Sequence, residues 1–251
     1  DTVDIAVVAE RMTAQLRLYK LPDMTPVDNG GIPVFSETPS HDEVMGVAIY
    51  HNTGNEDEAN HYAVVSRKSA PTDTAYLHQY QLYANNTGSY IQGRLVREFG
   101  KFSGLNEIEA IAVDSEAGYI YYSDEGFGIR KYAAHPDSEN TELALFGQDH
   151  FVDDHEGIAI YTAGPDKGYI LVSDQQGGQI HVYPRFGKES SPHHHSLLTQ
   201  INYLATDTDG IEVISDSLNP TFPKGLLVAM SDDKTFHIYD WQDVVKQIKS
   251  N

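Results

Sequence analysis

The sequence predicts an all-β chain folded as a β-propeller, and three observations carry this prediction. One pattern recurs four times, in which a polar or acidic residue and a small residue precede a run of alternating apolar residues. A second β-rich run and a third run ending in Tyr follow each copy, and a helical pattern is convincing only over 241–248. Short strands in repeated units are typical of propeller blades. A β-sandwich would give similar strands, but it would not repeat the same acid at the same strand entrance.

Each repeated unit supplies its strands in the same order along the chain. The first strands are predicted at 44–49, 108–113, 155–160 and 208–213. The second strands follow at 61–66, 119–123, 169–173 and 226–230, and the third at 77–80, 129–132, 180–183 and 236–239. More polar outer strands are expected at 93–97, 142–146 and 196–199.

The N-terminal stretch holds a fifth, partial copy. It supplies a second run at 5–9 and a third at 16–19, without a first strand. We therefore expect a single domain over 1–251, with about five blades' worth of strands and an incomplete N-terminal blade. Because an unpaired strand edge is a template for association, we expect an open ring, or one closed by another chain, and self-association through the open blade.

The composition excludes some classes of binding partner and some types of metal site. The formal charge of −20, from 37 acidic and 17 basic residues, would repel a nucleic-acid backbone and an anionic membrane. We expect neither nucleic acid nor a membrane as a partner, and no apolar run reaches the ~18 residues of a membrane span. With no cysteine, disulfides and thiolate metal sites are excluded.

The acidic residues recur at matching places in the repeat. Glu109, Glu156 and Asp209 stand at the entrances of the first strands, and Glu125 and Gln175 stand at the ends of second strands. Because the first strands of a propeller line its central channel, these side chains should converge at one mouth. Hard oxygen ligands without thiols or paired histidines favour Ca²⁺ over Zn²⁺. The sequence therefore predicts calcium at this mouth, although acids at blade junctions can instead satisfy exposed backbone amides.

Three basic residues, Arg11, Arg67 and Lys68, also follow second strands. Guanidinium, ammonium and a bound metal can all hold phosphate oxygens, and a metal lowers the pKa of a bound water. The combination predicts a highly anionic substrate and hydrolysis of a phosphate ester.

Long blocks of the chain resemble the β-propeller phytases, which are six-bladed enzymes that hydrolyse calcium-bound myo-inositol hexakisphosphate (phytate). The blocks are EIEAIAVDSEAGYIYYSDE (107–125), DHEGIAIYTAGPDKGYILVSDQQG (154–177) and DTDGIEV (207–213). The resemblance implies a calcium-dependent phosphomonoesterase of the 3-phytase type, acting on phytate or related esters and secreted or periplasmic.

The resemblance also assigns roles to individual positions. It implies a calcium and active-water shell of Glu109, Glu125, Asp154, Glu156, Gln175 and Asp209, in which we assign catalytic roles to Glu109, Glu156 and Asp209. Arg11 and Lys68 fall where the family binds substrate phosphates, and we add their neighbour Arg67.

Three positions depart from the family pattern. Met45 stands where the family has a calcium-contacting Tyr, and Tyr203 and Ser231 stand where it has Asp. Met45 and Tyr203, together with the incomplete N-terminal blade, favour the alternative, a catalytically degenerate calcium-binding propeller that binds a ligand or a protein.

Overall fold

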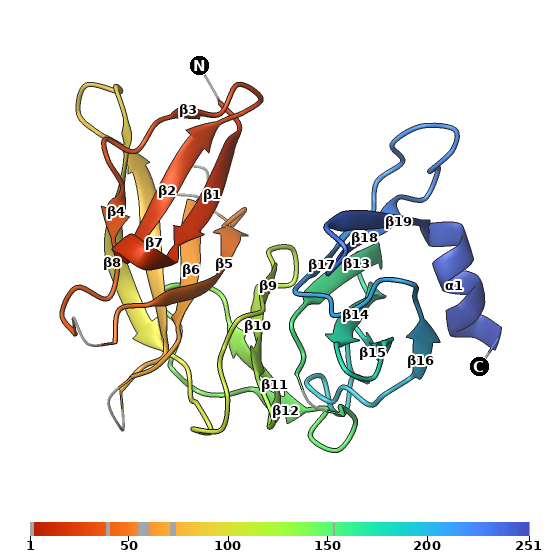
Figure 1. The fold of residues 1–251 in the computed structure, drawn as a ribbon. Coiled ribbons are helices and arrows are strands. Elements are labelled where there is room, and N and C mark those ends of the chain that lie inside the picture. Colours follow the sequence, from red (N-terminus) through yellow and green to blue (C-terminus); the bar gives the residue numbers. More distant parts are fainter. Residues whose placement is uncertain (1–2, 39–40, 55–60, 71–73, 153, 251) are drawn as a thin grey trace. The chain divides into compact units, whose positions relative to one another are not determined.

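The computed structural model describes residues 3–38, 41–54, 61–70, 74–152 and 154–250. Over these residues the chain forms five successive sheets and a C-terminal helix (Figure 1), which confirms the all-β, five-blade expectation. The chain divides into two compact units. Unit 1 comprises 1–102, 107–120 and 132–141, and unit 2 comprises 103–106, 121–131 and 142–251.

The first two sheets belong to unit 1. The first has the order β1-β2-β3, with β4 also paired to β2, and a 3-10 turn, η1, joins β1 to β2. Its elements are β1 (Ile5–Glu10), η1 (Arg11–Thr13), β2 (Gln15–Lys20), β3 (Thr25–Pro26) and β4 (Ile32–Pro33). The second sheet follows chain order, with β5 (Val44–His51), β6 (His61–Arg67), β7 (Leu77–Ala84) and β8 (Ile91–Phe99).

The third sheet contains the division between the units. Its order is β12-β11-β10-β9, which again places successive strands side by side. The strands are β9 (Ile111–Asp114), β10 (Tyr119–Asp124), β11 (Gly128–Ala133) and β12 (Ala144–Phe146).

The last two sheets and the helix belong to unit 2. The fourth sheet consists of β13 (Ile158–Gly164), β14 (Lys167–Asp174), β15 (Gln179–Pro184) and β16 (Thr199–Asn202). The fifth consists of β17 (Ile211–Ile214), β18 (Leu226–Ser231) and β19 (Thr235–Asp240). The outer strand that the sequence predicts at 196–199 lies further along the chain, as β16, because pairing with β15 begins only at Thr199.

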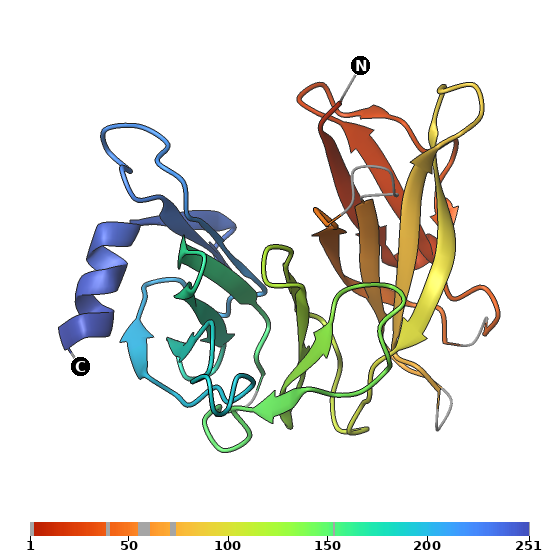
Figure 2. The same ribbon diagram turned by 180° about the vertical axis from the view of Figure 1, so that it is seen from behind.

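Helix α1 (Trp241–Ser250) is present where the sequence predicts a helix. Trp241, Val244, Val245 and Ile248 recur at the helical period and face the unit 2 core. The Trp241 ring stacks on Tyr161 with a centroid separation of 3.7 Å. Figures 1 and 2 show α1 beside the sheets of unit 2, where it contacts β16, β18 and β19. None of the helices in the described residues has the length and apolar character that crossing a lipid bilayer requires.

The burial pattern follows from the position of each strand in its sheet. In β2, Leu16 and Leu18 point into the unit 1 core, while Arg17 between them is partly exposed and paired with Asp28 at 2.7 Å. This period of two is that of a strand with one covered face. The second strand of a full sheet, such as β6, is instead buried along almost its whole length. Such strands form the buried centre of their sheets, and candidate site residues such as Lys68, Glu125 and Gln175 directly follow their last residues.

Candidate functional site

The acids of the repeated pattern lie just outside the strands. Glu109, Glu156 and Asp209 each stand two residues before the strands β9, β13 and β17. The sequence predicts strand entrances one residue before each acid, whereas the ladder begins only after the small residue. These acids therefore stand on short irregular segments at the strand entrances. Side chains there do not have to alternate between the two faces of a sheet.

The small residue after the acid has a packing role. A Cβ added at Gly157 would meet the backbone nitrogen of Ile211, the first residue of β17, at 2.6 Å. At the matching Gly46 of β5, an added Cβ would collide with the backbone oxygen of Glu109. Within each unit, glycine lets the entrance of one inner strand approach the entrance of the next. This close approach is what gathers the site loops of neighbouring blades.

In unit 2, Glu125 and Glu156 form a pair of carboxylates. One oxygen of each lies within 4.8 Å of the other, and Glu125 is only 4% exposed. Glu125 directly follows β10, and its segment is tied to that of Glu156 because Ser123 Oγ donates a hydrogen bond to the His155 carbonyl at 2.6 Å. Burial lowers the pKa of His155 to about 4, so the ring is neutral. Two oxygens on one Ca²⁺, each ~2.3–2.6 Å from the ion, lie at most about 5 Å apart, so this pair fits a shared calcium.

Three more of the predicted metal residues are connected in unit 2. Gln175 Nε2 donates to Asp209 Oδ1 at 3.1 Å, and the Gln175 backbone N–H donates to the Asp154 carbonyl at 3.0 Å. Two residues that the sequence did not single out extend this group. Asn106 Nδ2 lies 3.4 Å from Asp154 Oδ1, and Gln176 Nε2 donates to Asp154 Oδ2 at 2.9 Å. Their amide side chains give no sequence signal of their own, although Gln176 directly follows Gln175.

In unit 1, two predicted phosphate-binding cations lie close to acids. Lys68 Nζ is 2.6 Å from Glu107 Oε1, and Arg11 Nε is 4.0 Å from Glu43 Oε1. Burial alone would raise the pKa of Glu107, but the hydrogen bond from Lys68, a hydrogen bond shared with Glu109 and the charges of Lys68 and Arg11 outweigh it, so the pKa is lowered. Lys68 and Arg11 each keep more than a third of the side chain exposed, so both are accessible to an anion. Glu107, another residue the sequence did not single out, connects Lys68 to Glu109.

Arg67 differs from these two cations because its side chain is 2% exposed. Its guanidinium donates to Thr38 Oγ1 at 2.8 Å, to Thr74 Oγ1 at 3.2 Å and to the Ala75 carbonyl at 2.5 Å. It also lies 5.0 Å from the centre of the Phe35 ring. These contacts give Arg67 a structural role in the interior of unit 1, and we leave it out of the substrate-binding set.

The three departures from the family pattern supply no carboxylate. Met45 lies half-buried in β5, and Ser231 is buried at the end of β18, where its Oγ accepts the Thr206 N–H at 3.1 Å. Tyr203 packs against the unit 2 core, and burial raises its pKa to about 12. These three positions contribute packing or local hydrogen bonding in place of an acidic ligand.

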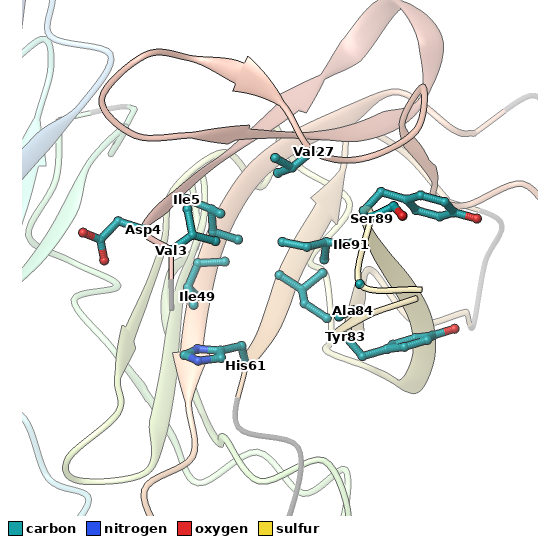
Figure 3. Close-up of a pocket in the computed structure, with 13 residues that line it drawn as sticks. Val3, Asp4, Ile5, Val27, Ile49, His61, Tyr83, Ala84, Ser89 and Ile91 are labelled. Atoms are coloured by element: carbon teal, nitrogen blue, oxygen red, sulfur yellow. The ribbon is translucent and has the colours of Figure 1, made fainter. Parts of the chain in front are cut away.

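A cavity of about 490 Å³ lies at the other ends of the unit 1 strands. Figure 3 shows Ile5, Val27, Ile49 and Ile91 directed toward its interior, with the His61 ring at its edge. Ile5 and His61 begin β1 and β6, whereas Arg11 and Lys68 follow the last residues of these strands. The cavity is therefore separate from the candidate phosphate-binding residues, and its apolar walls do not suit a phosphate.

Comparison with solved structures supports the fold. The chain is similar to the β-propeller domain of Cps50 (Swd1) from Myceliophteria thermophila, with a TM-score of 0.53 and 13% identity over 90% of this chain and 63% of that one. At this identity the likeness concerns the fold alone. It confirms the expectation of a propeller.

Sequence comparison identifies the family. The chain is 29% identical over 218 residues to the 3-phytase of Bacillus subtilis (strain 168), covering 82% of this chain and 54% of the relative. It thus spans about half the length of that curated relative. A family model described as Phytase matches residues 1–249, nearly the whole sequence. The chain therefore belongs to the Phytase family.

Proposed function

We propose that this chain acts as a calcium-dependent phosphomonoesterase on phytate or a related phosphate ester. The observation that carries the proposal is the group of oxygen donors in unit 2, in which Glu125 and Glu156 are close enough to share a cation. Asp154, Gln175 and Asp209 add further oxygens within one hydrogen-bonded group. Membership of the Phytase family supports the same activity.

Calcium suits the chemistry of these donors. Carboxylate and amide oxygens are the ligands that Ca²⁺ prefers, and its flexible coordination accommodates donors from several loops. We include Glu109 as a further ligand because it occupies the position in its repeat that Glu156 and Asp209 occupy in theirs. When bound, calcium would neutralise the acids, hold phosphate oxygens and lower the pKa of a bound water.

The residues of the chain would divide the remaining work. Arg11 and Lys68 would hold phosphate oxygens of the substrate, the Arg11 guanidinium through two parallel N–H donors and the Lys68 ammonium as a point charge. Glu109, Glu156 and Asp209 would orient the attacking water by accepting its hydrogen bonds. The resemblance to phytases also supports a secreted or periplasmic location.

The alternative is a calcium-binding propeller without catalysis that binds a ligand or a protein. The observation in its favour is that Met45, Tyr203 and Ser231 are packed or bonded locally and offer no carboxylate. Such a protein would keep the acidic group of unit 2 for stability.

Phosphate release from calcium phytate, together with calorimetric titration of Ca²⁺, separates these possibilities. We expect saturable calcium binding and phosphate release that stops with excess chelator. Calcium binding without phosphate release would favour the binding protein. Absence of calcium binding would refute both.

A further inference from the structure

Gln176 makes three hydrogen bonds to the candidate calcium residues, although no sequence motif singles it out. Its Oε1 accepts the backbone N–H of Asp154 at 2.9 Å, and its Nε2 donates to Asp154 Oδ2 at 2.9 Å and to Gln175 Oε1 at 3.0 Å. The two N–H groups of the amide are thus divided between two proposed ligands. The side chain is exposed, so its apolar part adds little to the core of unit 2.

These bonds restrict the orientation of both neighbours. The contact to the Asp154 backbone and carboxylate closes a small ring that fixes the Asp154 rotamer. The contact to Gln175 Oε1 leaves the Gln175 Nε2 directed at Asp209 Oδ1, at 3.1 Å. Gln176 therefore orients Asp154 and Gln175 directly, and it reaches Asp209 only through Gln175.

We propose that Gln176 is a positioning residue for the candidate calcium site, which holds Asp154 and Gln175 so that their remaining lone pairs face the cation. This inference rests on the proposed function. Gln176 uses one lone pair of Asp154 Oδ2 and one of Gln175 Oε1, and each of these oxygens keeps a second lone pair. Residues that orient metal ligands commonly contribute 10- to 100-fold to metal affinity.

The test substitutes Gln176 with Met, which keeps the length of the side chain and removes all three hydrogen bonds. Calorimetric titration with Ca²⁺ alone should show at least about tenfold weaker binding in Q176M than in the unsubstituted chain. Melting curves in excess chelator should coincide for the two proteins, because the amide is exposed and acts only through its neighbours. Phosphate release should fall at limiting calcium and recover at saturating calcium.

Gln242 provides the matched control. Its Nε2 donates to Asp240 Oδ2 at 3.2 Å, which is the same type of exposed contact, at the start of α1. Q242M should bind calcium like the unsubstituted chain. Equal calcium affinity in Q176M and the unsubstituted chain would overturn the positioning role, as would a loss of melting temperature in chelator that accounts for the weaker binding. If the unsubstituted chain itself gives no calcium signal, the proposed function fails first, so the two failures are distinguishable.

Discussion

The Lys68 Nζ lies 2.6 Å from Glu107 Oε1, so a proposed substrate-binding cation is already paired with a carboxylate of the chain. A phosphate that binds Lys68 must either displace Glu107 or bind with the negative charge of Glu107 close by. Because both side chains are partly exposed, the ion pair contributes at most about 1 kcal/mol. Glu107 is therefore a modest competitor for the anion and not a barrier to it.

Substituting Glu107 with Gln should tighten the binding of inorganic phosphate by roughly two- to fivefold, measured by calorimetry without calcium. E43Q is the control, since Glu43 lies 4.0 Å from Arg11 and its removal should have a smaller effect. Weaker phosphate binding by E107Q would show that Glu107 orients Lys68 and does not compete for it.

Glu156→Gln should weaken calcium binding by at least about tenfold while leaving the fold intact. The substitution keeps the side-chain volume but removes a charge that lies within 4.8 Å of Glu125. Since like charges repel, the variant should be at least as stable as the parent in chelator. Calcium titration and phosphate release measure the effect, with exposed Glu189→Gln as the control. Parental calcium affinity and phosphate release in E156Q would contradict the site.

Calcium should raise the melting temperature of the chain. Binding to the native state alone stabilises it by about 2.7 kcal/mol at a free concentration one hundred times Kd. For a chain of this length the shift corresponds to roughly 5–10 °C. Excess chelator should reverse it, as followed by calorimetry or circular dichroism. Coincident melting curves in calcium and in chelator would remove the argument for a metal site.

Arg67 and Lys68 are adjacent in the sequence, but their substitution should affect different properties, stability for Arg67 and phosphate binding for Lys68. Arg67→Met removes the buried guanidinium that donates to Thr38, Thr74 and Ala75 and should cost roughly 2–4 kcal/mol of stability. Lys68→Met removes a partly exposed ammonium and should spare stability but weaken phosphate binding. Chemical denaturation and phosphate titration of both variants provide the measurement. Loss of phosphate binding in a stable R67M variant would return Arg67 to the substrate-binding set.

The contrast between Arg67 and Lys68 shows where sequence reasoning reaches its limit. The alternation of apolar residues predicts the strands, and the spacing of Trp241, Val244 and Ile248 predicts α1, because both are local periodicities. The repeated acids were found because they recur at one register of the repeat. Whether a basic side chain at a strand end points outward or into the core depends instead on the last residue that pairs in the ladder. Arg67 is the final residue of β6, and Lys68 follows it.

Glu107 and Gln176 mark a second limit. Both act through contacts with residues that the sequence did identify, Lys68 and Asp154, and neither belongs to the repeated pattern. A polar residue at a loop position is indistinguishable by type from one that is merely solvated. Only the distances between side chains separate the two cases.

Stability should decline as the pH falls from about 6.5 to about 4, in part because of His195. Burial, assisted by the charge of Lys131, lowers the pKa of His195 to about 4. The ring is held neutral, with Nδ1 donating to the Pro184 carbonyl at 2.8 Å and Nε2 lying 3.2 Å from Lys131 Nζ. Above pH 6.5 the ring is neutral in both the folded and the unfolded chain, so its contribution is constant. Between the two pKa values only the unfolded chain takes up the proton, which costs the folded state at most about 3 kcal/mol by pH 4.

His195→Gln should flatten the dependence of melting temperature on pH across this window in chelator, whereas exposed His194→Gln should not. An equally steep dependence in H195Q and the parent would show that His195 titrates normally in the folded chain.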